Sequence, residues 1–186
     1  FLFGGPRLYP TWGLSHLGFG LVAILVVSLG STLYPARIAT RIDPKALREA
    51  IRQVVLAAAV EDSRPVLTGV NLEIEGTALT LAAADGFRLA VHTTAVLDAV
   101  PEKLSVIVPA RTLQEVERLI DGDDPVDVVV TTQRSQVLFR LKNVEIVSQL
   151  IQGTFPNYSQ LVPQNHTTRV IVDLAELQRA TRTASI

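Results

Sequence analysis

Apolar residues recur at helical spacing in three segments of the chain. The segments follow Ile42-Asp43, Val108-Pro109 and Val172-Asp173, and each carries a leucine with apolar or small residues three and seven positions later. A period near 3.6 residues predicts a helix with one apolar face. Asp43 followed by Pro44 also suits a helix start. We therefore expect helices from about residue 43, over 111–120, and from residue 174.

Between the predicted helices the pattern changes to the period of two that is typical of strands. Residues 70–75 alternate, Gly76-Thr77 predicts a turn, and a second strand begins at Leu79. Asp85-Gly86 predicts a tight turn before another alternating run. Further strands are expected at residues 106–108, 126–131, 137–141, 144–150 and 169–172. A helix followed by several strands, repeated, predicts an α+β fold.

The three predicted helices indicate an internal duplication. Leu47, Leu113 and Leu177 lie 66 and 64 residues apart, which suggests repeated half-domains more than a solenoid. The side opposite the apolar face repeats basic or amide residues. This row suits contact with a phosphate backbone. A solvated face with charge pairs, such as Glu49 with Arg52 and Glu115 with Arg118, explains the pattern equally well.

The amino-acid composition limits the kinds of chemistry that the protein can perform. The 186 residues include no cysteine, which excludes disulfides and thiolate metal sites, and the three histidines are far apart in sequence. The acids Asp62, Asp85, Asp123 and Asp124 are a conceivable acid–base or metal cluster. Residues 121–124 are more simply a solvated turn, and no nucleophile–base pair appears. We expect a protein that is not an enzyme and has no metal site or cofactor.

The net charge of −1 conceals a break in composition. Residues 1–41 carry only Arg7, Arg37 and Arg41 as charges, and residues 13–34 are almost wholly apolar or small. About 20 such residues can span a bilayer. A transmembrane helix with its C-terminal side in the cytoplasm is therefore expected, with a buried helix or a signal peptide as alternatives. The segment ending in LYPAR (residues 33–37) resembles the last membrane helix of bacterial transporter permeases.

Three motifs after this segment carry a second resemblance. They are SRPVLTGV at residues 63–70, ADGFRLAV at 84–91, and FPNY at 155–158 followed by Val162-Pro163. In this order they resemble the bacterial sliding clamp family, the β subunit of DNA polymerase III. The resemblance assigns residues 42–163 to a clamp central domain and 164–186 to the start of a third domain, with 1–41 foreign to the clamp. It implies a DNA clamp fold of two helix-plus-antiparallel-sheet half-domains.

The resemblance also implies the function and its partners. A homodimeric ring would encircle double-stranded DNA without reading sequence and tether the polymerase in the cytoplasm. The DNA-facing residues would be Lys45, Arg48, Arg52, Arg111, Gln114, Arg118 and Arg182. A pocket for polymerase and clamp-loader peptides would use Leu67, Gly86, Phe87, Arg88, Leu89 and Pro163.

Two departures from the family bear on this pocket. Phe87 stands where the family often has histidine or tyrosine, and Ala84 where threonine is common. An ordinary hairpin with Phe87 and Leu89 in the core is the alternative to a pocket.

The alternative function is the C-terminal part of a transporter permease with a cytoplasmic domain, touching the membrane through residues 1–41. The chain starts without methionine and ends inside a predicted helix, so we expect a fragment of a longer protein. The junction between its two parts is expected within residues 38–46.

Overall fold

The computed structural model describes residues 38–61, 63–163 and 165–185. The described chain divides into two compact units, and the boundary between them along the sequence lies between Thr154 and Phe155.

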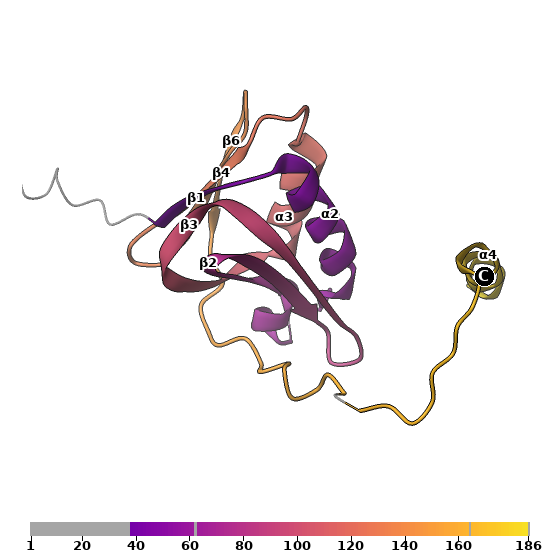
Figure 1. The fold of residues 1–186 in the computed structure, drawn as a ribbon. Helices are drawn as coiled ribbons and strands as arrows, with labels where there is room; N and C mark the ends of the chain where they lie inside the picture. Colours follow the sequence, from indigo (N-terminus) through magenta and orange to yellow (C-terminus); the bar gives the residue numbers. More distant parts are fainter. Residues whose placement is uncertain (1–37, 62, 164, 186) are drawn as a thin grey trace, which may run out of the picture. The chain divides into compact units, whose positions relative to one another are not determined.

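The first unit is a six-stranded antiparallel sheet with two α-helices (Figure 1). The sheet order is β2-β3-β1-β4-β5-β6. The elements are β1 (Ile38–Ile42), α2 (Pro44–Val54), the short 3-10 helices η1 (Val55–Ala57) and η2 (Pro65–Thr68), β2 (Gly69–Ala84), β3 (Leu89–Pro109), α3 (Ala110–Leu119), β4 (Val126–Val130), β5 (Gln136–Arg140) and β6 (Glu145–Gln149).

Both predicted helices of this unit are confirmed, and the start of α2 has a local cause. The Asp43 carboxylate accepts a hydrogen bond from the Ala46 backbone N–H at 2.9 Å, and Pro44 fills the first helical position. The apolar faces predicted from the spacing are buried, with Leu47 and Leu113 fully inaccessible to solvent. The two helices lie next to each other and pack on the same side of the sheet (Figure 1).

The strands after α2 are longer than the sequence pattern predicts. β2 runs for 16 residues and β3 for 21, so the predicted turn at Gly76-Thr77 and the separate strand at residues 106–108 are wrong. Gly76 instead lies at a shift in the β2–β3 register, with φ of +59°. A glycine with positive φ suits a β-bulge as well as a turn. The local signal was real, but the strand continues through it.

Strand β1 lies between β3 and β4, in the middle of the sheet. Its residues pair with β4 from Ile38↔Val130 to Ile42↔Val126, and Ile42 also pairs with Val96 of β3. Residues 38–41, expected at the end of the membrane-like segment, are therefore part of this sheet. Residues 1–37 of that segment lie outside the described residues. Within the described ranges, no helix is long and apolar enough to cross a bilayer.

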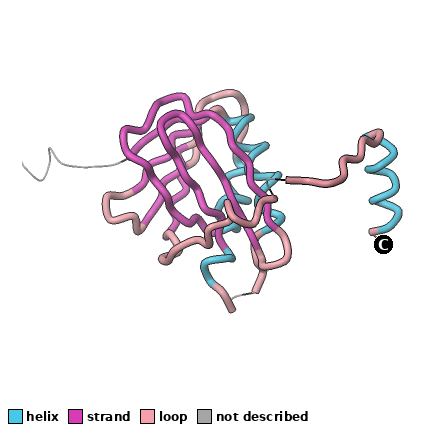
Figure 2. Tube along the Cα trace, turned by 60° about the horizontal axis from the view of Figure 1, so that its bottom comes forward, coloured by secondary structure: helices cyan, strands magenta, loops and turns pink. Residues whose placement is uncertain are grey.

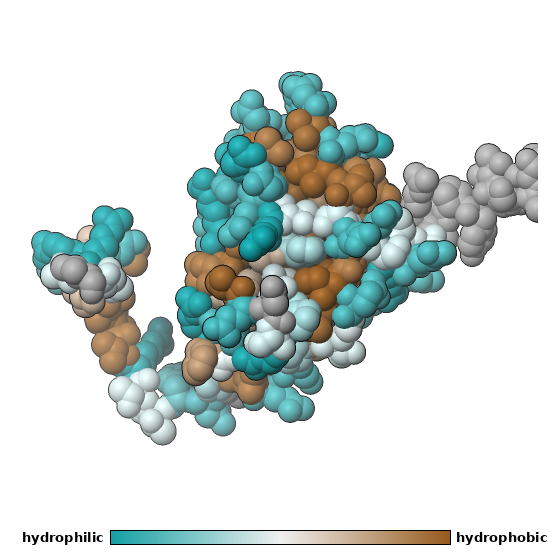
Figure 3. All heavy atoms as spheres, turned by 180° about the vertical axis from the view of Figure 1, so that it is seen from behind, coloured by the Kyte–Doolittle hydropathy of each residue, from teal (hydrophilic) through white to brown (hydrophobic). Residues whose placement is uncertain are grey.

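The sheet curls around the core that it shares with the two helices (Figure 2). The backbone of Ile151, just after β6, pairs back with Ile107 of β3. The core is made of Leu, Ile, Val and Ala side chains from both helices and from every strand except β6, together with Phe139. Ile146 of β6 is partly buried and packs against it. Viewed from behind, the surface still shows apolar patches between polar ones (Figure 3). Phe87, Val60 and Val147 are among the large apolar residues left exposed.

The second unit holds the third predicted helix, α4 (Leu174–Ala184). The Asp173 carboxylate caps this helix by accepting from the Glu176 backbone N–H at 3.0 Å. The strand predicted near residues 169–172 is not formed, so that prediction is wrong. Leu177, the repeat counterpart of Leu47 and Leu113, is 50% exposed.

Candidate nucleic-acid interface and peptide pocket

Six of the seven residues predicted to face DNA lie on α2 and α3. On α2, Lys45 pairs with Asp123 at 2.9 Å, and Arg52 pairs with Glu117 at 2.8 Å. Arg48 is half-buried, and its Nη2 donates to the backbone carbonyl of Ile120. The basic row of α2 is thus bound to α3 and to the loop that follows it.

The corresponding row on α3 is more open. Among the described residues, Arg118 pairs with Glu115 of its own helix, at 2.6 Å, which confirms one of the two charge pairs predicted from the sequence. The other predicted pair is absent, because Arg52 binds Glu117 across the helices. Arg111 and Gln114 are exposed, and neither makes an ion pair or side-chain hydrogen bond within the described part of the chain. Arg182 lies on α4, in the second unit.

Solvent exposure determines how strongly the basic side chains of α2 are held by their partners. The hydrogen bond and the charge of Asp123 raise the pKa of Lys45 above its usual value. Both side chains of this pair are more than three-quarters exposed, and so water and salt screen their attraction. A phosphate group can therefore compete with such an exposed partner at little cost. The half-buried Arg48 has less access to solvent and to any ligand in it.

The turn between β2 and β3 is organised by Asp85. Its Oδ1 accepts from the backbone N–H groups of Phe87 and Arg88 at 2.9 and 2.8 Å. Its Oδ2 accepts from the Arg88 Nε and Nη2 at 2.9 and 2.6 Å. These hydrogen bonds, led by the one from Phe87, lower the pKa of Asp85 to about 2.

Gly86 suits this turn because of its backbone conformation. Its φ is +95°, a left-handed conformation that side chains disfavour. A Cβ atom there would also lie 2.9 Å from Nη2 of Arg64. That same Nη2 donates to the carbonyl of Asp85 at 3.3 Å. The turn and Arg64 therefore hold each other in place.

Phe87 projects into solvent from this turn with 98% of its side chain exposed. The alternative that placed Phe87 in the core of an ordinary hairpin is therefore wrong. Leu89 is half-buried at the start of β3, and Leu67 is 6% exposed. A hollow of about 240 Å³ lies beside the turn, with Phe87 and Arg88 in its lining. The complete lining is Ala59, Val60, Glu61, Ser63, Arg64, Asp85, Phe87 and Arg88.

The structure unites only part of the predicted peptide pocket. Phe87 and Arg88 line the hollow, while Pro163 belongs to the second unit. Sequence reasoning missed Arg64 and Val60 as lining residues. Arg64 stands inside the SRPVLTGV motif, so the motif could have pointed to it.

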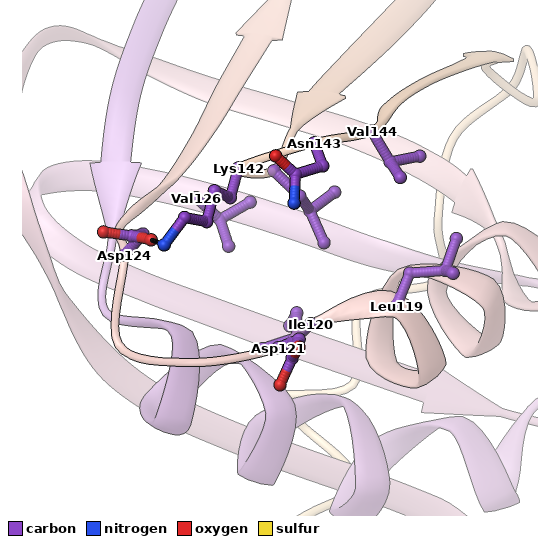
Figure 4. Close-up of a pocket in the computed structure, with 9 residues that line it drawn as sticks. Leu119, Ile120, Asp121, Asp124, Val126, Lys142, Asn143 and Val144 are labelled. Atoms are coloured by element: carbon purple, nitrogen blue, oxygen red, sulfur yellow. Dashed lines mark ion pairs between the residues drawn. The ribbon is translucent and has the colours of Figure 1, made fainter.

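A second cleft, of about 210 Å³, lies at the end of α3 (Figure 4). Asp124 pairs across it with Lys142 at 2.9 Å. Asp123 binds Lys45 instead, so these two acids of the 121–124 loop each have a lysine partner. No three histidine or acidic side chains within the described residues gather closely enough to hold a metal ion.

The curled antiparallel sheet with its helices is the fold of sliding clamps. Residues 41–157 match the family model for the DNA polymerase III beta subunit, central domain. The chain therefore belongs to the bacterial sliding clamp family, the β subunit of DNA polymerase III.

Individual relatives agree with this assignment. The beta sliding clamp of Bacillus subtilis is 38% identical over 151 residues, and that of Staphylococcus aureus is 34% identical over 149. Both matches cover 80% of this chain but only 39% of the relative. The crystal structure of the Bacillus subtilis DNA polymerase sliding clamp matches with a TM-score of 0.75 and 35% identity, over 80% of this chain and 39% of that one. The Pseudomonas aeruginosa β subunit matches with a TM-score of 0.74 and 28% identity, covering 81% and 41%.

Proposed function

We propose that this chain is part of a sliding clamp, a ring that encircles duplex DNA and tethers a polymerase without chemistry of its own. The observation that carries the proposal is the family match over residues 41–157, which includes both helices of the sheet's helical side. This match also favours the clamp over the permease alternative. The intact protein would form the ring as a homodimer.

DNA contact is proposed for the exposed row of α3. Arg111 and Arg118 offer guanidinium groups, and Gln114 between them offers an amide. Guanidinium groups bind the phosphate oxygens of DNA whatever its base sequence. A clamp that slides needs contacts of this kind. Arg182 on α4 would extend the row to the third domain.

Peptide binding is proposed for the hollow beside the β2–β3 turn. Its exposed Phe87 and its two arginines suit a short peptide with apolar and acidic residues. Such peptides would come from a polymerase and a clamp loader. Leu67, Gly86, Leu89 and Pro163 would complete this pocket in the whole clamp.

The DNA contact can be tested by the salt dependence of binding to a short duplex. The double variant Arg111→Ala, Arg118→Ala should make the plot of log affinity against log salt less steep by about two. Each phosphate contact contributes roughly one to this slope. The matched control, Lys103→Ala with Arg140→Ala, removes two cations from β3 and β5. If the control lowers the slope as much as the α3 pair, the contact is a general charge effect and the assignment to α3 fails.

A further inference from the structure

Three basic side chains of α2 meet partners at regular intervals in the second half of the first unit. Lys45, Arg48 and Arg52 stand about one helical turn apart. Their partners are, in the same order, Asp123, the carbonyl of Ile120, and Glu117. The partner numbers fall as the α2 numbers rise. One side of α2 is therefore joined to α3 along its length, with the two helices antiparallel.

Arg48 is the central member of this interhelix row (Lys45, Arg48 and Arg52). Ile120 is the C-terminal cap residue of α3, and the last carbonyls of a helix lack partners within it. A guanidinium donating there also faces the negative end of the helix dipole. The Nε of Arg48 is buried and has no hydrogen-bond partner in the described structure. This guanidinium is therefore held against α3 in a site that water reaches poorly.

We propose that Arg48 and Arg52 of the interhelix row position α2 against α3 and do not contact DNA, with Arg48 as the principal positioning residue. The inference rests on the proposed function, and it divides the predicted DNA row in two. Arg48 and Arg52 each have an acceptor across the helix pair, a backbone carbonyl for Arg48 and a carboxylate for Arg52. The phosphate contact is left to Lys45, whose pair with Asp123 is open to solvent, and to Arg111, Gln114 and Arg118. Among the described residues, the ion partner of Arg118 is Glu115 of the same helix.

The first test is a charge swap measured by urea unfolding. Arg52→Glu and Glu117→Arg should each lower the unfolding midpoint, and the double variant should regain most of the loss, because the pair is restored with reversed sign. Arg48→Met should also lower the midpoint, by more than Lys103→Met, which removes an exposed cation on β3. Additive losses in the double variant would overturn the proposal.

The second test uses the same short duplex and salt series. Arg48→Met and the Arg52→Glu, Glu117→Arg double variant should keep the wild-type slope. A fall of about one in the slope for Arg48→Met would mean that Arg48 contacts a phosphate, and would overturn the proposal. If Arg48→Met does not fold, the double variant still tests whether Arg52 contacts a phosphate, and a slope that falls by about one in that variant would overturn the proposal. If the unchanged protein shows no salt-dependent binding, the proposed function fails, and the interhelix row is still decided by the charge swap.

Discussion

The carboxylate of Asp85 determines how the β2–β3 turn presents its neighbours. Four donors from Phe87 and Arg88 converge on its two oxygens, and this fixes the backbone at Phe87. With its backbone held, the Phe87 ring extends into solvent at the rim of the hollow. An exposed, pre-positioned aromatic ring loses little conformational freedom when a partner covers it. The turn therefore prepares an anchor for a peptide.

The acid stability of the protein should depend on Asp85. Its pKa is about 2 when folded, below the usual aspartate value of about 3.9. A lowered pKa means that the carboxylate stabilises the fold above about pH 4 and that this contribution is lost as the pH falls toward 2. Asp85→Asn should therefore be less stable than wild type at pH 6, with the difference shrinking toward pH 2.5. Urea unfolding at a series of pH values measures this.

The control for this experiment is Glu102→Gln, at an exposed site with no ion pair in the described chain. It should leave the shape of the pH dependence unchanged. A constant difference between Asp85→Asn and wild type at all pH values would contradict the role given to the charge.

At residue scale, the sequence predicts which residues share a helix side but not what they touch. Helical spacing placed Arg48 and Arg52 in one row, which is correct. Their partners, Ile120 and Glu117, lie 72 and 65 positions away, and no local pattern reports such distant contacts. Arg64 escaped notice for the same reason, because its contact with Asp85 spans 21 positions.

At the scale of elements, features with local causes were predictable and features with distant causes were not. The caps at Asp43 and Asp173 act within four residues, and both predicted helix starts are confirmed. Strand β1 is only five residues long, and it is held by neighbours that are far away in sequence. In the sequence alone, its apolar residues therefore look like a continuation of the preceding apolar segment.

The repeat supplies a matched pair of variants for helix packing. Leu113 of α3 is fully buried, while its repeat counterpart Leu177 of α4 is half exposed. Leu113→Ala should lower the free energy of unfolding by about 2–5 kcal/mol, because it leaves a cavity under the helix. Leu177→Ala should change it by less than about 1 kcal/mol. Chemical denaturation followed by circular dichroism compares the two, and equal losses would mean that α4 is packed as tightly as α3.

At the scale of the whole molecule, the two halves of the first unit are joined through β1. The strand stands between β3 of the first repeat and β4 of the second. Thr40 is buried and donates to the Asp98 carbonyl at 2.9 Å, and Arg41 binds the Asp98 carboxylate at 2.7 and 3.0 Å. A repeat alone would not predict this arrangement, because the strand that precedes α2 pairs with β4 of the neighbouring repeat as well as with β3.

This arrangement predicts where the folding unit begins. A fragment of residues 38–154 should unfold cooperatively in urea, because it contains the whole sheet and the buried Ile42. A fragment of residues 43–154 lacks the strand between β3 and β4, so both strands would expose unpaired backbone groups to water. It should show no cooperative transition, as measured by circular dichroism. If both fragments unfold with the same midpoint and the same denaturant dependence, β1 adds nothing to the fold, and the clamp part would begin after it.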